Sequence, residues 1–313
     1  MSLLKKEKMT LRQVAKSVWQ NKSIYLMMIP VIVWAIVFCY IPIYGIIIAF
    51  KDYSPGLGFW GSPWVGFKHF EAFFGKDFWR IMRNTLFISL GTLIVGFPAP
   101  VIFAVLLTSV KNKVFRKVSQ TLSYIPHFVS WVVVSAICFI LFAPESGTIN
   151  SLLRSMGIIE GSIGFLENGP LFDVMLILVN VWKSTGFSAI IYFAAIAGVD
   201  AELYEAATID GARPIQQIWY ITIPSILPTI IVMLVLSISG VLNAGFEQQM
   251  VMANNLVWKW ADVIDTYSYR YGLSKLRYSY GTAIGLFKSV IALILLLGSN
   301  KLMKKITGYS LYS

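Results

Sequence analysis

The chain has 313 residues, of which 57% are hydrophobic and 13% are charged, and its formal net charge is +11. Soluble domains carry about 25% charged residues, so this composition excludes an ordinary soluble protein and indicates a membrane protein. Because the basic residues lie mostly in short segments between apolar runs, we expect no nucleic-acid partner.

Six apolar segments are long enough to cross the bilayer as helices, for which about 20 residues are needed. They are continuously apolar, which favours helices over the alternating strands of a barrel. The first segment is too long for the apolar region of a signal peptide, so we expect it to be retained. The sequence therefore predicts an all-α integral membrane protein with six transmembrane helices, at residues 24–50, 86–108, 122–143, 171–197, 223–245 and 282–303.

Positive charge gathers on one side of these spans. The amino-terminal tail, residues 1–23, has six Lys or Arg residues against Glu7 alone, and the segment after the second span has four bases and no acid. The carboxyl end, 304–313, continues this pattern with Lys304 and Lys305. Since positive loops stay in the cytoplasm, both termini are predicted to be cytoplasmic. The basic, partly apolar tail is expected to lie on membrane lipid.

One predicted cytoplasmic loop, 198–222, is acidic instead, with Arg213 as its one base. Asp200 can cap a helix at 201–208, and Gly211 suits the left-handed turn that ends it. Pro214 can open a second helix, 214–220, and Pro224 is expected to separate this helix from the next span. The loop is thus predicted to be a helix-turn-helix, and from these residues alone an interfacial amphipathic linker is slightly favoured over a surface that contacts another protein.

The order Glu205-Ala206-Ala207, Gly211 and Ile221-Thr222-Ile223-Pro224 resembles the EAA motif of ATP-binding-cassette importer permeases, with Ile223 where that motif has leucine. The string LYEAATIDGA is similar to the carbohydrate-uptake, maltose-type branch of that family, and residues 64–74, 78–89 and 179–191 resemble it as well. Within this branch the chain is most similar to permeases for oligosaccharides, including pectin-derived and alginate-derived ones.

This resemblance implies a type I importer permease fold. An outer loop and lead-in helix would occupy 51–85, and the transport core 86–303 would contain the coupling loop, 198–224. It also implies partners: two ATPase subunits, a second related permease and an extracytoplasmic sugar-binding protein, in the bacterial cytoplasmic membrane. The residues that would contact the ATPase are Glu205, Ala206, Ala207, Asp210 and Gly211.

The energy for transport is expected to come from a partner. The sequence has no phosphate-binding loop, and the near match GTAIGLFKS has Phe287 where the second glycine belongs. ATP and Mg²⁺ would therefore bind to the ATPase subunits, and we expect no cofactor and no catalytic residue in this chain.

A substrate path is predicted from polar residues that recur at helical spacing in two spans. Amides and hydroxyls suit sugar hydroxyls, and an aromatic ring suits the apolar face of a sugar; Lys183 could pair with Glu247 or with the carboxylate of a uronate. The alternative is that these side chains only join packed helices, and Lys288 has no assigned role. The predicted path consists of Asn180, Lys183, Ser184 and Phe187 in the fourth span and Ser239, Asn243 and Glu247 in the fifth.

The sequence is less consistent with three other functions. A secondary transporter or channel that ATP does not drive would need carboxylate relays at mid-membrane, and only Glu247 near a span end is available. A membrane enzyme or metal site is disfavoured because His69 and His127 have no acidic or thiol neighbours at ligand spacing. A permease for amino acids or phosphate is disfavoured by the form of the LYEAATIDGA string.

Overall fold

The computed structural model describes residues 19–312, and these residues form helices and connecting loops without a named strand. Residues 1–18 of the predicted amino-terminal tail lie outside this described part of the chain. In chain order the elements are α2 (Lys22–Ala35), the π-helix η1 (Ile36–Tyr40), the 3-10 helix η2 (Ile41–Phe50), α3 (Gly58–Gly61), α4 (Lys68–Phe73), α5 (Phe78–Gly96), α6 (Pro98–Thr108), α7 (Lys113–Phe128), α8 (Trp131–Phe142), α9 (Thr148–Ser155), α10 (Gly169–Ala197), α11 (Ala201–Ile209), α12 (Pro214–Gln217), the π-helix η3 (Ile218–Thr222), α13 (Ile223–Ser239), α14 (Phe246–Met252), α15 (Trp258–Ala261), α16 (Ile264–Ser268), the π-helix η4 (Tyr269–Leu273) and α17 (Tyr278–Thr307).

Five helical segments in the described part are long and apolar enough to cross a membrane, and the bent pair α7 and α8 makes a sixth if it is counted as one span. The all-α membrane fold predicted from the sequence is therefore confirmed. The five segments are Lys22–Phe50, Phe78–Thr108, Gly169–Ala197, Pro214–Ser239 and Tyr278–Thr307.

The third predicted span, 122–143, is not one straight helix, because α7 and α8 meet at an angle of 100°. Val129 leaves the helical conformation, with φ −73° and ψ 132°. Ser130 then caps the new helix by accepting a hydrogen bond from the backbone N–H of Val133. This capping signal interrupts a stretch that is otherwise apolar enough to be predicted as continuous.

The fifth predicted span, 223–245, also has different limits. Its helix runs unbroken from Pro214 to Ser239, so the prediction that Pro224 separates it from the preceding short helix is wrong. The π-helical turn η3 immediately precedes Pro224, and such wider turns accommodate a local fault in helical hydrogen bonding. At the other end the chain leaves the helix at Gly240 and turns through Gly245, which has a left-handed φ of 88°.

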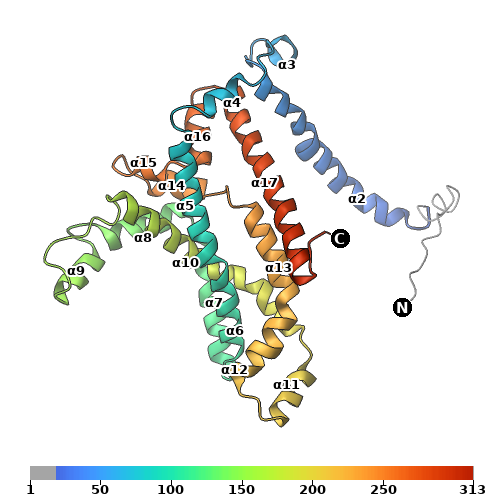
Figure 1. Ribbon diagram of the computed structural model, residues 1–313, viewed down its shortest axis with the longest axis vertical. Coiled ribbons are helices and arrows are strands. Elements are labelled where there is room, and N and C mark those ends of the chain that lie inside the picture. The colour runs from blue at the N-terminus through green and yellow to red at the C-terminus, as the bar shows by residue number, and fades with distance from the viewer. Residues whose placement is uncertain (1–18, 313) are drawn as a thin grey trace.

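Figure 1 shows how these helices are arranged. The first helical segment stands away from the others at α2, which buries no residue, whereas its second half, η2, packs beside α17. The pair α11 and α12 lies at the end of the molecule opposite α3 and α4 (Figure 1). The molecule therefore has two opposite ends, joined by α5, α6, α10, α13 and α17.

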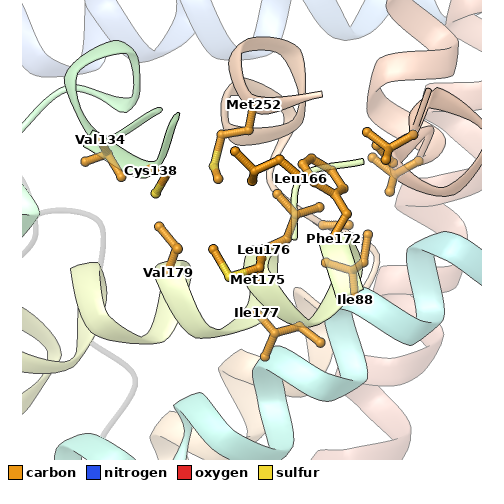
Figure 2. Close-up of a cluster of buried hydrophobic side chains, with 14 residues drawn as sticks. Ile88, Val134, Cys138, Leu166, Phe172, Met175, Leu176, Ile177, Val179 and Met252 are labelled. Atoms are coloured by element: carbon orange, nitrogen blue, oxygen red, sulfur yellow. The ribbon is translucent and has the colours of Figure 1, made fainter. Parts of the chain in front are cut away.

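The largest apolar core joins α10 to α5, α8, α14 and α15 (Figure 2). Phe172 and Leu176 on α10 lie at its centre and are fully buried. Farther along α10, Gly186 lies against the backbone of α7, and a Cβ added there would lie 2.0 Å from the carbonyl oxygen of Ser123. Glycine at this position permits the two helices to cross at backbone contact, which places α10 in the middle of the fold.

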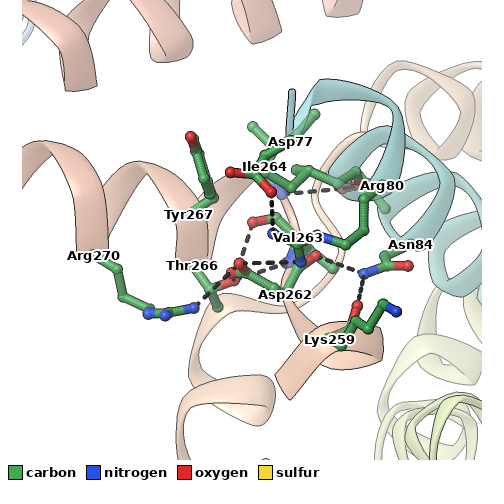
Figure 3. Close-up of polar contacts among 12 residues, drawn as sticks. Asp77, Arg80, Asn84, Lys259, Asp262, Val263, Ile264, Thr266, Tyr267 and Arg270 are labelled. Carbon is green, nitrogen blue, oxygen red and sulfur yellow. Dashed lines mark hydrogen bonds and ion pairs between the residues drawn. The ribbon is translucent and has the colours of Figure 1, made fainter. Parts of the chain in front are cut away.

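A second, polar cluster ties α5 to the segment 258–270 (Figure 3). The carboxylate of Asp262 is only 1% exposed and lies 3.1 Å from Arg270 and 3.6 Å from Arg80 on α5. It also accepts a hydrogen bond of 2.8 Å from the hydroxyl of Thr266. Asn84 extends the link by donating to the carbonyl of Asp262 at 3.0 Å. Burial raises the pKa of Asp262, against the opposing effect of Thr266 and the two arginines.

Candidate functional site

A cavity of about 260 Å³ lies among α5, α6, α10, α13 and the turn 240–245. Four separate helices supply its walls, so it exists only in the folded bundle. Its polar lining is made of hydroxyls and amides, and none of the residues that line it is charged. These polar residues are Ser89, Thr92, Asn180, Ser184, Ser188, Tyr192, Ser237 and Asn243.

Several of these side chains have unused hydrogen-bonding capacity, among them Ser89 and Asn243. The hydroxyl of Ser89 is buried and has no hydrogen-bond partner among residues 19–312. Asn243 is itself exposed, although its neighbours Leu242 and Ala244 are buried, and its side-chain amide makes no hydrogen bond to the described residues. A buried polar group without a partner costs free energy, so this wall is suited to a ligand that carries hydroxyl groups.

The structure brings together three of the predicted path residues, Asn180, Ser184 and Asn243. The predicted helical stripe in the fifth span is wrong, because α13 ends at Ser239 and Glu247 belongs to a separate helix, α14. The hydroxyl of Ser239 is bonded back to the carbonyl of Leu236 at 2.7 Å, outside the cavity.

Lys183 points away from the cavity to the break between α7 and α8. Its ammonium group donates to the carbonyl oxygens of Pro126, at 3.2 Å, and His127, at 2.5 Å, and lies 5.4 Å from the centre of the Trp131 ring. One turn later on α10, Phe187 stacks on His127 with the ring centroids 3.9 Å apart. Lys183 thus satisfies carbonyls at the end of α7, where a cation also complements the helix dipole. Within the described chain it forms no ion pair with Glu247.

The sequence did not identify five of the polar lining residues: Ser89, Thr92, Ser188, Tyr192 and Ser237. For two of them a signal was present, because Asn180, Ser184, Ser188 and Tyr192 recur every four residues on α10. The other three come from α5 and α13, and no spacing within one segment can reveal that they share a cavity with α10.

The acidic loop forms a compact helical hairpin at the end of the molecule opposite α3 and α4. Asp200 caps α11 by accepting a hydrogen bond of 3.0 Å from the N–H of Glu202, as predicted. Gly211 has the predicted left-handed conformation, with φ 78°, and Pro214 begins α12. The helix-turn-helix prediction is therefore confirmed, although the second helix continues through η3 into α13.

Two side-chain contacts hold this hairpin closed. The hydroxyls of Tyr204 and Thr222 lie 2.9 Å apart, and the Gln217 amide donates to the hydroxyl of Thr208 at 2.9 Å. The opposite face is left free: Glu205, Ala206 and Asp210 are exposed, while Ala207 is half-buried. Apolar groups accompany these acids on the surface, since Ile209 is 86% exposed.

Lys288, a base within the membrane-spanning part of α17, has an acidic partner. Its ammonium group forms an ion pair with Asp265, which lies on α16. Both side chains are mostly removed from solvent, at 19% and 24% exposure. Lys288 therefore joins α17 to the segment 258–270, which also carries Asp262, a structural role that its position in an apolar span did not reveal.

The sequence that forms these features matches a known family of membrane proteins. The family described as "Binding-protein-dependent transport system inner membrane component" matches residues 96–307, which include most of the cavity wall and the whole hairpin. The chain belongs to this family. It is accordingly a multi-pass transport permease subunit, and the resemblance to importer permeases is confirmed.

Curated relatives of this permease span nearly its whole length. Protein LplB of Bacillus subtilis (strain 168) is 46% identical over 94% of this chain and 92% of its own. The polygalacturonan/rhamnogalacturonan transport system permease protein YteP of the same strain is 42% identical over 94% of this chain and 91% of its own. Among solved structures, a chain of a bacterial ABC transporter involved in the import of the acidic polysaccharide alginate superposes with a TM-score of 0.84 at 37% identity, covering 94% of this chain and 99% of that one.

Proposed function

We propose that this permease carries an oligosaccharide, including one that contains uronate units, through an importer powered by a separate ATPase. The observation that carries this proposal is the uncharged cavity lined by hydroxyl and amide groups, with Ser89 and Asn243 free to bond a ligand. Sugars present many hydroxyl groups, and such a wall can hydrogen-bond to them in several registers.

The acidic character of the cargo is supported by the relatives. One is named for polygalacturonan transport, and the similar solved structure belongs to an alginate importer. The cavity contributes no cation, so a uronate carboxylate would meet the amide donors of Asn180 and Asn243 in this chain. The direct contacts are Asn180, Ser184 and Asn243, whereas Lys183, Phe187, Ser239 and Glu247 lie outside the cavity lining.

The hairpin at the other end would receive the force for transport. Its exposed acids, with Ile209 beside them, form a surface suited to a basic cleft with apolar walls on an ATPase. Glu205 and Asp210 would face cations of the ATPase, Ala206 and Ala207 would allow close approach, and Gly211 would set the turn. ATP and Mg²⁺ would bind to two such ATPase subunits.

The importer would have two further kinds of partner, a second permease and a binding protein. A second permease would complete the translocation path, and both termini would be cytoplasmic because basic residues flank the same side of the spans. An extracytoplasmic binding protein would deliver the sugar. The structure of the alginate importer in complex with an alginate pentasaccharide-bound periplasmic protein supports this expectation.

The test is uptake by the assembled importer in proteoliposomes, with labelled oligogalacturonate and a neutral oligosaccharide of equal length. We expect uptake that requires ATP inside the vesicles and the binding protein outside them. Glu205→Lys should reduce uptake at least about tenfold by placing like charges at the contact, whereas Glu202→Lys, another exposed acid of α11, should have a smaller effect. ATP-independent uptake driven by an ion gradient would instead assign the chain to the secondary transporters.

A further inference from the structure

A second cavity, of about 820 Å³, lies between the transport core and the hairpin. The end of α6, the beginning of α7, the last turns of α10 and the segment from α11 to η3 enclose it. In Figure 1 these elements meet at the end of the molecule where α6, α7 and α12 are labelled. The cavity is therefore separate from the uncharged one, which lies nearer the middle of the bundle.

Two cations line this second cavity, Lys111 in the loop before α7 and Arg116 on α7. Arg116 is half-buried, yet in the described chain neither side chain has an ion pair, a hydrogen bond or an aromatic ring as partner. The acids of the neighbouring hairpin do not neutralise them. A partly desolvated guanidinium without a counter-charge is unfavourable, and its planar donors match a phosphate well.

One part of the remaining wall is apolar. Val105 on α6 and Ile190, Phe193 and Ile196 on α10 line the cavity beside the two cations. A ligand that fits both parts needs an anionic head and a hydrocarbon chain. Basic pockets between membrane helices on the cytoplasmic side are known to bind anionic lipid headgroups.

We propose that this cavity binds one anionic phospholipid, with its phosphate at Arg116 and Lys111 and an acyl chain along Val105, Ile190 and Phe193. Tyr204, Gln217 and Thr222 of the hairpin region line the same space. The bound lipid therefore contacts both the core and the coupling hairpin and stabilises their relative position. Placing the lipid in the cytoplasmic leaflet rests on the proposed orientation, whereas the binding itself does not.

The experiment is native mass spectrometry of the full-length chain, purified in detergent with the subunits that remain bound to it. The protein is stripped of lipid and then mixed with phosphatidylglycerol or with phosphatidylcholine of the same acyl chains. We expect retention of one phosphatidylglycerol, and retention at least about tenfold weaker for Arg116→Gln, because a charge-assisted contact is lost. Arg116→Lys should restore part of the binding.

Matched controls are Lys113→Gln and Lys117→Gln, which remove the same charge from exposed positions of α7 that do not line the cavity. Their retention of phosphatidylglycerol should equal that of the unaltered protein. A monodisperse elution profile and an unchanged melting temperature without lipid establish that each variant is folded.

Three results would overturn the inference. Phosphatidylcholine could bind as strongly as phosphatidylglycerol, or the two variants at Arg116 and the two control variants, Lys113→Gln and Lys117→Gln, could lose lipid equally. Alternatively, inorganic phosphate could displace the bound lipid and stabilise the protein to the same extent, which would assign the cations to a free phosphate compound. Loss of lipid specificity with ATP-driven uptake intact would overturn this inference alone and leave the proposed function standing.

Discussion

The hydroxyl of Tyr204 on α11 lies 2.9 Å from the hydroxyl of Thr222, which is the last residue of η3 and is buried. This contact connects the exposed helix of the hairpin to the turn from which α13 continues across the membrane. Because α13 also lines the uncharged cavity, the pair lies on a direct physical connection between the hairpin and that cavity.

Removal of this hydrogen bond should weaken coupling without unfolding the bundle. We expect Tyr204→Phe to cost about 0.5–1.5 kcal/mol locally and to reduce sugar uptake per ATP hydrolysed about two- to tenfold. The ratio of uptake to ATPase activity in proteoliposomes measures this effect. Tyr220→Phe is the control, because Tyr220 lies on the same π-helix as Thr222, η3, but is 80% exposed. An unchanged ratio for Tyr204→Phe would show that this contact carries no coupling.

Lys183→Met should destabilise the protein instead of changing its preference for acidic sugars. The substitution leaves the carbonyls of Pro126 and His127 without their shared donor, at a cost of about 1–3 kcal/mol. The melting temperature in detergent should fall, and uptake of acidic and neutral oligosaccharides should fall in the same proportion. Selective loss of acidic substrates at an unchanged melting temperature would contradict this role and would point to a carboxylate at Lys183.

Asn243→Ala should raise the KM for uptake with little change in stability. Its amide is exposed at the cavity and makes no hydrogen bond within residues 19–312, so only a ligand contact is lost. A neutral hydrogen bond to a ligand is worth about 0.5–1.5 kcal/mol, which corresponds to roughly a two- to tenfold rise in KM. Ser239→Ala is the matched control, since this hydroxyl is bonded within its own helix outside the cavity. Equal KM values for both variants would remove Asn243 from the path.

Asp262→Asn should change how stability depends on pH. Burial raises the folded-state pKa of Asp262 above its ordinary value of 3.8. The contribution of this group to stability is therefore fully present below pH 3.8 and is lost as the pH rises through the folded-state pKa. Relative to Asp262→Asn, the unaltered protein should lose stability as the pH rises from 3.8 to neutrality, and the melting temperature measures this loss. Asp77→Asn, a more exposed partner of Arg80, should leave the slope unchanged, and parallel curves for Asp262→Asn would contradict the assignment.

Much of the fold follows from local patterns. Long apolar runs predict membrane helices because an unpaired backbone cannot remain in hydrocarbon, and the hairpin follows from Asp200, Gly211 and Pro214, whose effects act within one turn. The same local patterns gave wrong helix limits where a short polar or glycine signal lies inside or next to an apolar run. Ser130 starts a new helix inside an apolar stretch, and Gly240 ends α13 before Asn243 is reached.

The candidate site was predicted only in part for a related reason. Asn180 and Ser184 share a face of one helix, so their spacing was sufficient to group them. Lys183, one residue earlier than Ser184, faces α7 instead, because the neighbouring helix end offers carbonyl acceptors that no linear pattern describes. Ser89 and Ser237 join the cavity from other helices, at positions set by the packing of α5 and α13 on α10.

By itself the sequence determined that this protein is a bundle of membrane helices with an acidic helical hairpin, because hydrophobicity, capping and turn preference depend on residues within a few positions of one another. Only the tertiary structure decided which polar groups face a ligand, which cations lack a counter-charge and which ones bind carbonyls or carboxylates within the protein. Those properties depend on distances between separate helices, and crossings such as that of Gly186 with Ser123 determine these distances.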